Sequence, residues 1–188
     1  MGEKRHGESD MKIRREWAMP SHKTFSINPI YAFVSYYLSK SKISIDPFAK
    51  NVNLATYTND LNPGTTAQYH LPAHEFLEKM ISEKIEPDLI FFDPPYSLRQ
   101  LKECYENVGI KFNQQMSQSF HWGREKKLMD QLLKKDGVIL SFGWNTSGMA
   151  KANGYATEEI LLVCHGGAHN DTICMAERKT SEQMRLFN

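Results

Sequence analysis

The sequence predicts an α/β domain built on a doubly wound, mostly parallel β-sheet that closes with an antiparallel hairpin. Two patterns predict this fold class. Short apolar, β-branched or aromatic runs alternate with segments of helical periodicity, which is the order of a parallel sheet with helices packed on it. Near the C-terminus two such runs, 160–164 and 172–176, are joined by a short loop containing Gly166-Gly167, as in an antiparallel hairpin.

The expected elements follow the chain in order. Strands are expected at 43–46, 55–58, 67–71, 89–92 and 138–142, and the two hairpin strands bring the number to seven. Asn28 and Pro29 form a helix start signal, because asparagine caps a helix and proline suits its first turn. Further helices are expected after Pro72, after Tyr96 and over 128–133.

Length and composition fit a single domain. The chain has 188 residues, of which 40% are hydrophobic and 24% are charged, and its net charge is +1. A charge this small does not indicate a polyanionic partner through the field of the whole molecule. The first residues are polar and basic, so we expect 1–16 to be a flexible tail and 17–188 to be one globular domain; contact of this basic run with nucleic-acid phosphates is the alternative.

Cysteine usage indicates a reducing compartment. The three cysteines are scattered and lack CxxC spacing, so we expect free thiols and a cytoplasmic location. Cys164, His165, His169 and Cys174 match no standard ligand spacing, and we therefore expect no metal. No apolar run approaches a membrane-spanning length and no signal peptide is recognisable, so we expect no membrane partner.

The tetrapeptide Asp93-Pro94-Pro95-Tyr96 follows the most apolar strand. The two prolines fix φ and lack backbone N–H groups, so the chain leaves the strand as a rigid, extended ledge. In open α/β sheets, ligands bind at the carboxyl ends of the strands. A simple turn after a buried strand is the alternative for an Asp-Pro pair, but the full tetrapeptide after an apolar strand is a specific signal.

This ledge suits methyl transfer to an exocyclic nucleobase amine. The lone pair of such an amine is delocalised into the ring, which makes it a poor nucleophile. The Asp93 carboxylate and the Pro94 carbonyl, held by Pro95, can accept one amine hydrogen each and so direct the lone pair outward. Tyr96 can stack on a flipped base. The catalysis would come from positioning and electrostatics, without a covalent intermediate.

The predicted strand ends also indicate a nucleoside cofactor. Asp60 follows the second predicted strand, where an acid can bind ribose hydroxyls; an Asx-type turn is the alternative. The loop after Asp46 lacks the GxGxxG fingerprint, which disfavours a dinucleotide. S-adenosylmethionine fits because it has a ribose and no diphosphate, and Phe48 can form an apolar wall for its adenine.

In these motifs, the chain resembles the S-adenosylmethionine-dependent amino-group DNA methyltransferases. Asp93-Pro94-Pro95-Tyr96 is similar to their catalytic motif in its adenine-N6 form, and 45–49 and 58–63 are similar to their cofactor motifs. The resemblance covers roughly 17–179 and implies a seven-stranded Rossmann-like methyltransferase sheet. It also implies S-adenosylmethionine as methyl donor, with S-adenosylhomocysteine as product. The cofactor contacts it implies come from Phe25, Pro29, Asp46, Phe48, Ala49, Asn51, Asp60 and Leu61.

The chain departs from the family pattern at three places. Lys50-Asn51 stands where the family usually has a glycine, and no aspartate follows the third predicted strand, where Glu75 is the nearby acid. The segment available for target recognition is short, 97–122, so we expect weak selectivity, a specificity partner or a homodimer. The residues expected to contact nucleic acid are Lys111, His121, Arg124 and Trp144, the last as a wall of the base pocket or as a rim tryptophan.

The leading function is methyl transfer to adenine N6 in DNA. The same chemistry on adenine N6 or guanine N2 of RNA, or on cytosine N4, stays open. A non-catalytic, nucleic-acid-binding subunit with a methyltransferase-like fold is the alternative from a different class; the missing glycine favours it and the intact ledge opposes it.

Overall fold

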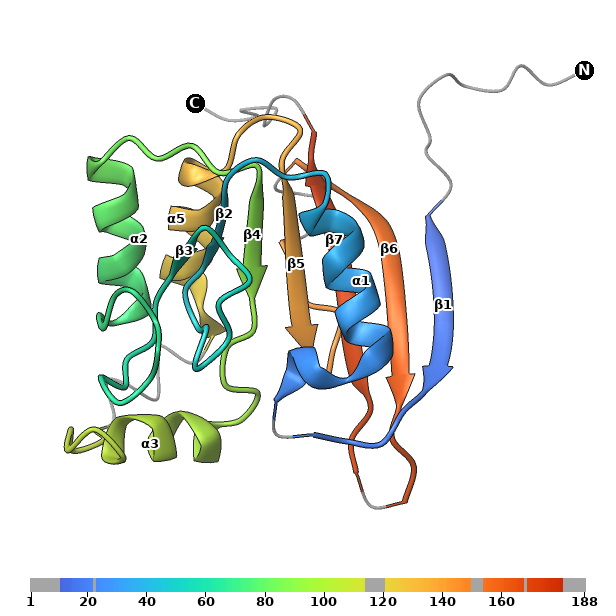
Figure 1. Cartoon of the computed structure of the whole chain (residues 1–188), viewed down its shortest axis with the longest axis horizontal. Coiled ribbons are helices and arrows are strands. Elements are labelled where there is room, and N and C mark those ends of the chain that lie inside the picture. The colour runs from blue at the N-terminus through green and yellow to red at the C-terminus, as the bar shows by residue number, and fades with distance from the viewer. Residues whose placement is uncertain (1–10, 22, 114–120, 150–153, 168, 181–188) are drawn as a thin grey trace, which may run out of the picture.

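The computed structural model describes residues 11–21, 23–113, 121–149, 154–167 and 169–180. Its sheet has seven strands in the order β1-β6-β7-β5-β4-β2-β3 (Figure 1). The strands are β1 (Lys12–Trp17), β2 (Ser44–Asp46), β3 (Tyr57–Thr58), β4 (Leu89–Phe92), β5 (Val138–Gly143), β6 (Tyr155–Cys164) and β7 (Thr172–Lys179). The helices are η1 (Thr24–Ser26), α1 (Asn28–Leu38), α2 (Ala73–Ser82), α3 (Leu98–Glu106) and α5 (Gly123–Leu132).

The pairing confirms a mostly parallel sheet that closes with an antiparallel hairpin. β4 lies between β2 and β5 and is parallel to both, and β3 is parallel to β2. β7 inserts between β5 and β6 and runs antiparallel to each. β6 and β7 are therefore the expected hairpin, and the predicted fold class is correct.

Two of the expected elements were wrong. Residues 12–16, expected in a flexible tail, belong to edge strand β1, which pairs in parallel with β6. Its side chains are largely exposed, with Ile13 at 66%, so the strand is held by backbone pairing and leaves no burial pattern in the sequence. The expected strand 67–71 is reduced to a single bridge between Asn59 and Tyr69, because β3 is only two residues long. The number of strands agrees with the expected seven, but β1 replaces 67–71.

Alternating side chains of the central strands build a core on each face. In β4, Leu89 and Phe91 pack toward α1, whereas Ile90 and Phe92 pack toward α2 and α5. A strand buried on both faces reads as a continuous apolar run, which is what residues 89–92 show. α1 begins at Asn28, one residue before the position expected from Pro29, and covers one face of the sheet (Figure 1).

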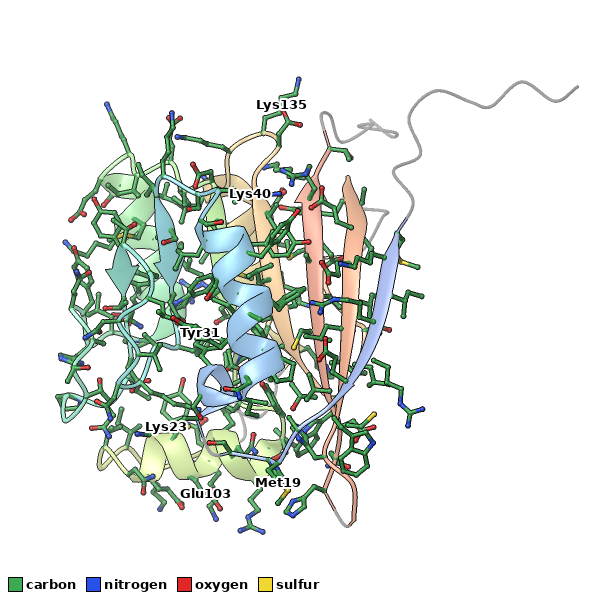
Figure 2. All side chains as sticks on the ribbon, turned by 45° about the vertical axis from the view of Figure 1, so that its right-hand side comes forward. Met19, Lys23, Tyr31, Lys40, Glu103 and Lys135 are labelled. Carbon is green, nitrogen blue, oxygen red and sulfur yellow. The ribbon has the colours of Figure 1, made fainter. Side chains whose placement is uncertain are left out.

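The carboxyl ends of the parallel strands lie along one edge of the molecule. In Figure 1 the arrowheads of β4 and β5 point toward the edge along which α3 lies. Figure 2 shows Met19, Lys23 and Glu103 at this edge, away from Lys40 and Lys135. Because β4 ends there, the Asp93 ledge opens onto this edge. None of the described helices is long and apolar enough to cross a membrane.

Candidate active site

A cavity of about 950 Å³ opens at this edge of the sheet. Its walls come from the loops after β2, β3 and β4, from α3, and from the segment before α1. The β6–β7 loop and the loop after β5 complete it. Segments far apart in the sequence therefore converge on the tetrapeptide, as expected for strand ends in a doubly wound sheet.

Asp93 lies buried in this cavity, at 7% exposure. The Tyr96 hydroxyl donates a hydrogen bond to Asp93 Oδ1, and the Thr24 hydroxyl also hydrogen-bonds to Asp93. Burial raises the pKa of Asp93, while the positive charge of Lys50 and these hydrogen bonds oppose the shift. The carboxylate is thus an acceptor whose partners in the free protein are hydroxyl groups.

Tyr96 is held by the start of the next helix. Its backbone N–H donates to Gln100 Oε1 at 2.7 Å, and Ser97 Oγ accepts the Gln100 N–H at 3.2 Å, capping α3. The Tyr96 and Trp144 ring centroids are 5.6 Å apart and the rings are inclined by 70°. Burial, and then the neighbouring Asp93, raise the pKa of the Tyr96 hydroxyl, so this group is a neutral donor.

The loop after β2 keeps a glycine-like conformation at Lys50. Its φ is +53°, in the left-handed region that glycine adopts without a steric penalty. The Lys50 N–H donates to Asp60 Oδ2 at 3.1 Å, and the Ala49 N–H donates to the Asn59 carbonyl at 2.8 Å. The backbone bend is therefore present although the residue is lysine.

Asp46 stabilises this loop through a hydrogen bond to its backbone. It is 1% exposed and accepts the Phe48 N–H at 2.9 Å. Burial raises the pKa of Asp46 to about 8, and the negative charges of Asp93 and Asp60 add to the shift. Asp46 does not line the cavity, so its action on the site runs through the Phe48 backbone.

Asp60 forms the Asx-type turn that its sequence context allows. Its Oδ1 accepts the Asn62 N–H at 2.8 Å while Oδ2 accepts the Lys50 N–H. The residue also lines the cavity beside Leu61, at the carboxyl end of β3. Each carboxylate oxygen can accept a further hydrogen bond, so the turn and a ligand contact are compatible.

The structure brings most, but not all, of the expected cofactor residues to the cavity wall. Phe48, Asn51, Asp60 and Leu61 line it, together with the whole tetrapeptide. The remaining four, Phe25, Pro29, Asp46 and Ala49, are not among its lining residues. Phe25 packs in the core, with ring centroids 5.7 Å from Phe91 and 5.0 Å from Phe142, because the segment before α1 turns it inward.

The expected nucleic-acid contacts are dispersed. Trp144 lines the cavity and, with His121, a smaller adjoining hollow of about 160 Å³. Arg124 is exposed and pairs with Glu78 at 2.6 Å, and Lys111 lines neither space. Gln114 and Gln115, in the segment 97–122 that is available for target recognition, lie outside the described residues.

Cys164, His165 and Cys174 have structural roles in and beside the hairpin. The two ring nitrogens of His165 lie 2.9 Å from the Ala18 carbonyl and 2.9 Å from Thr172 Oγ1. Cys164 and Cys174 are buried free thiols. In the described part of the chain, no three His, Cys, Asp or Glu side chains are grouped to hold a metal ion.

Thr24, His74 and Glu125 line the cavity although the sequence does not mark them as site residues, and Trp122, a possible nucleic-acid contact, lines it as well. Trp122 precedes α5 with a left-handed φ of +55° and packs edge-on against Phe48, with centroids 5.3 Å apart. Glu125 lies in the first turn of α5 and is 5% exposed. A glutamate inside an otherwise polar helical segment carries no sequence signal of burial, so only the packing of α5 against α2 reveals it.

No protein-family model matches the sequence, and neither does a curated protein. Solved structures do match the fold. TrmN from Thermus thermophilus is 16% identical with a TM-score of 0.52, and the match covers 80% of this chain and 48% of that one. NSun6 from Pyrococcus horikoshii, solved with SFG, is 12% identical with a TM-score of 0.50, covering 79% of this chain and 51% of that one. The chain spans about half the length of these structures. At such identities the likeness concerns the fold, and the chain has the α/β Rossmann-like fold of methyltransferases.

Proposed function

We propose that the protein transfers the methyl group of S-adenosylmethionine to the N6 amine of adenine in DNA. The observation that carries this proposal is the position of Asp93-Pro94-Pro95-Tyr96. The tetrapeptide ends β4 with a buried carboxylate and opens onto a cavity that also contains Asp60. A site with these groups can hold an amine next to a nucleoside cofactor.

The cavity suits S-adenosylmethionine in size and chemistry. Its volume of about 950 Å³ exceeds what one nucleoside needs and leaves room for a target base. Asp60 offers carboxylate oxygens to ribose hydroxyls, and Phe48, Leu61 and Trp122 offer apolar walls. The fold is shared with S-adenosylmethionine-dependent methyltransferases. The cofactor supplies an electrophilic methyl group.

Asp93 and the Pro94 carbonyl hold the target amine. In the free protein the Tyr96 hydroxyl occupies an acceptor position on Asp93 that the amine takes when it binds. Two acceptors that each receive one N–H would pull the nitrogen toward tetrahedral geometry and leave its lone pair free to attack the methyl group that the cofactor would supply. S-adenosylhomocysteine would be the leaving group, and the surplus proton on the nitrogen could pass to the Asp93 carboxylate. The displaced Tyr96 ring is then free to stack on the base, with Trp144 at its edge.

The segment 97–122 contributes substrate recognition in this proposal. Its helix α3 supplies Gln100, Cys104 and Tyr105 to the cavity wall. The segment is short, which favours weak sequence selectivity or a partner that adds selectivity. A long, strictly specified target for the isolated protein would contradict this part.

One experiment tests the function and its alternatives together. The protein is incubated with methyl-labelled S-adenosylmethionine and with separate DNA and RNA pools, and the modified nucleoside is identified by mass spectrometry. N6-methyladenine from DNA supports the proposal. The label on RNA, on guanine N2 or on cytosine N4 supports the corresponding alternative, and absence of label from every pool supports a non-catalytic binding subunit.

A further inference from the structure

In the family that the chain resembles, an acid after the third strand often holds the adenine amine of the cofactor, and this chain has no aspartate there. Glu75 is the nearest acid in the sequence, but its side chain is 53% exposed and it does not line the cavity. We infer that Glu125, from the first turn of α5, accepts the hydrogen bond of the cofactor's adenine amine and so makes the site selective for adenine. This inference rests on the proposed function.

A continuous set of contacts leads from the ribose-binding position to Glu125. The Asp60 N–H donates to the Tyr69 carbonyl at 3.1 Å, which places the 69–71 segment beside the end of β3. Asn59 fixes the same segment, because its side chain donates to the Leu71 carbonyl and accepts the Leu71 N–H, both at 3.0 Å. α2 starts at Ala73, immediately after this clamp. An adenine attached to a ribose at Asp60 therefore lies over Leu71 and the start of α2.

Glu125 closes this part of the cavity from the opposite side. Its Oε1 lies 3.9 Å from His74 Nδ1, in the first turn of α2. That distance is too long for a hydrogen bond. The side chain is 7% exposed and lines the cavity, and no other side chain of the described residues donates a hydrogen bond to it. The donor that reaches the carboxylate is the backbone N–H of Glu125 itself, and a carboxylate can accept several hydrogen bonds, so it can still accept one from a ligand in the cavity.

The surroundings match an adenine edge. The amine of adenine is a donor, and the adjacent ring nitrogen is an acceptor. Glu125 supplies an acceptor, and the first N–H groups of α2, which has no side-chain cap, supply donors. Leu71 and Trp122 line the same cavity and present apolar surface to the faces of the base. Burial raises the pKa of Glu125, while its own backbone N–H and the charges of His74 and Arg124 oppose the shift.

A purely structural role is the competing explanation. An acid in the first turn stabilises a helix through the helix dipole. In that role Glu125→Gln lowers the thermal unfolding midpoint and leaves ligand preference unchanged. A role in adenine recognition changes the preference between ligands that differ only at the amine.

The test compares S-adenosylhomocysteine with S-inosylhomocysteine, in which a carbonyl replaces the amine, by isothermal titration calorimetry. The wild-type protein is expected to prefer the adenine ligand by at least about 100-fold, because the carbonyl meets a carboxylate and leaves it unpaired. In Glu125→Gln the amide can donate to the carbonyl, so the preference should fall by roughly 10-fold or more. Glu75→Gln is the matched control: it changes an acid in the facing helix turn that also lies 3.9 Å from His74, and it should keep the wild-type preference.

The outcomes separate the two levels of the proposal. Wild-type protein that binds neither ligand refutes the proposed function and this inference with it. The preference is the ratio of the dissociation constants of the two ligands. If wild-type protein binds S-adenosylhomocysteine and this ratio is near one, the inference is overturned and the proposed function stands. The same holds if the ratio is equal in wild type and Glu125→Gln. A loss of preference in Glu75→Gln alone assigns the role to Glu75 and overturns it as well.

Discussion

At the scale of single residues, two buried carboxyl groups, Asp46 and Asp93, lie near the positive charge of Lys50. Asp46 and Asp93 are both nearly inaccessible, and burial raises the pKa of each. The positive charge of Lys50 opposes both shifts. Carboxyl groups with pKa values shifted by burial cluster at functional sites.

Replacing Asp93 should abolish methyl transfer without unfolding the protein. Asp93→Ala and Asp93→Asn both remove the charged acceptor, and we expect single-turnover rates to fall at least about 100-fold, as for loss of one preorganised electrostatic partner. Because the change removes a buried carboxylate, the midpoint of thermal unfolding by circular dichroism should stay equal or rise. Turnover at the wild-type rate in either variant would refute the catalytic assignment.

Tyr96 should contribute to methyl transfer mainly through stacking of its ring on the target base. Tyr96→Ala should slow transfer by roughly 5- to 150-fold, which corresponds to the 1–3 kcal/mol typical of base stacking on an aromatic side chain. Tyr96→Phe keeps the ring and removes the hydroxyl that occupies Asp93, so its loss should be much smaller. The measurement is the single-turnover rate at saturating cofactor; equal losses in the two variants would exclude stacking as the contribution of Tyr96.

Asp46 should make the protein less stable as the pH rises. Its folded pKa is about 8 and its unfolded pKa is about 3.9, so between these values the folded state holds a proton that the unfolded state has lost. The free energy of unfolding from this group therefore falls from about pH 4 to about pH 8.

Asp46→Asn should remove this dependence while it keeps an acceptor for the Phe48 N–H. At pH 8 we expect it to be more stable than wild type by roughly 1–3 kcal/mol, the usual cost of a buried polar group that is not fully satisfied. Urea unfolding at pH 5 and pH 8 measures the effect. A difference between the two proteins that is the same at both pH values would contradict the assignment of the buried charge to Asp46.

At the scale of elements, the conformation of a loop at a strand end can persist although its residue type differs from the one that favours it. The loop after β2 keeps a left-handed residue, although lysine stands there. A non-glycine residue in this region costs about 1–2 kcal/mol. The strain is compatible with function because the bend brings the Lys50 N–H to Asp60 and its charge toward Asp93.

Lys50→Gly should relieve this strain. We expect a gain of about 0.5–1 kcal/mol in the free energy of unfolding, since the greater freedom of glycine in the unfolded chain offsets part of the relief. Lys50→Ala is the matched control, because it also removes the charge but keeps the left-handed strain. Both variants should raise the pKa of Asp93 and move the acidic limb of the activity profile to higher pH. Equal stability of the two variants in urea would argue against strain at residue 50.

At the scale of the whole molecule, several of the described cations are already paired, and Lys50 is a cation in the cavity wall. The net charge is +1. Among the described cations, Arg124 pairs with Glu78, Arg14 pairs with Glu16 and Glu159, and Lys126 donates to the carbonyls of Ser147 and Gly148. Binding of nucleic acid should therefore depend more on the base pocket than on phosphate contacts.

The small net charge and the paired cations predict a weak salt dependence of nucleic-acid binding. We expect log Kobs to fall with log salt concentration with a slope shallower than about −3, because few phosphates are neutralised. Fluorescence anisotropy with a single-stranded and a duplex oligonucleotide between low and moderate salt measures the slope. A slope near −6 or steeper would show that basic residues, including those of the N-terminal segment, dominate binding.

The sequence by itself determined the class of fold and the position of the Asp93 ledge. An apolar strand, two prolines and the acid before them carry their own local physics, so the ledge at Asp93 could be located without tertiary information. The parallel order and the hairpin followed from periodicity. Asp60 could be recognised as a turn residue or a ligand residue, and the structure shows the turn.

Only the tertiary structure decided the features that depend on distant neighbours. β1 forms through backbone pairing with β6 and leaves no burial pattern. Phe25 turns into the core rather than toward the cofactor cavity, because its partners Phe91 and Phe142 lie on other strands. Glu125 is buried because α5 packs on α2. Such positions result from contacts between segments far apart in the chain, and local residue patterns do not encode them.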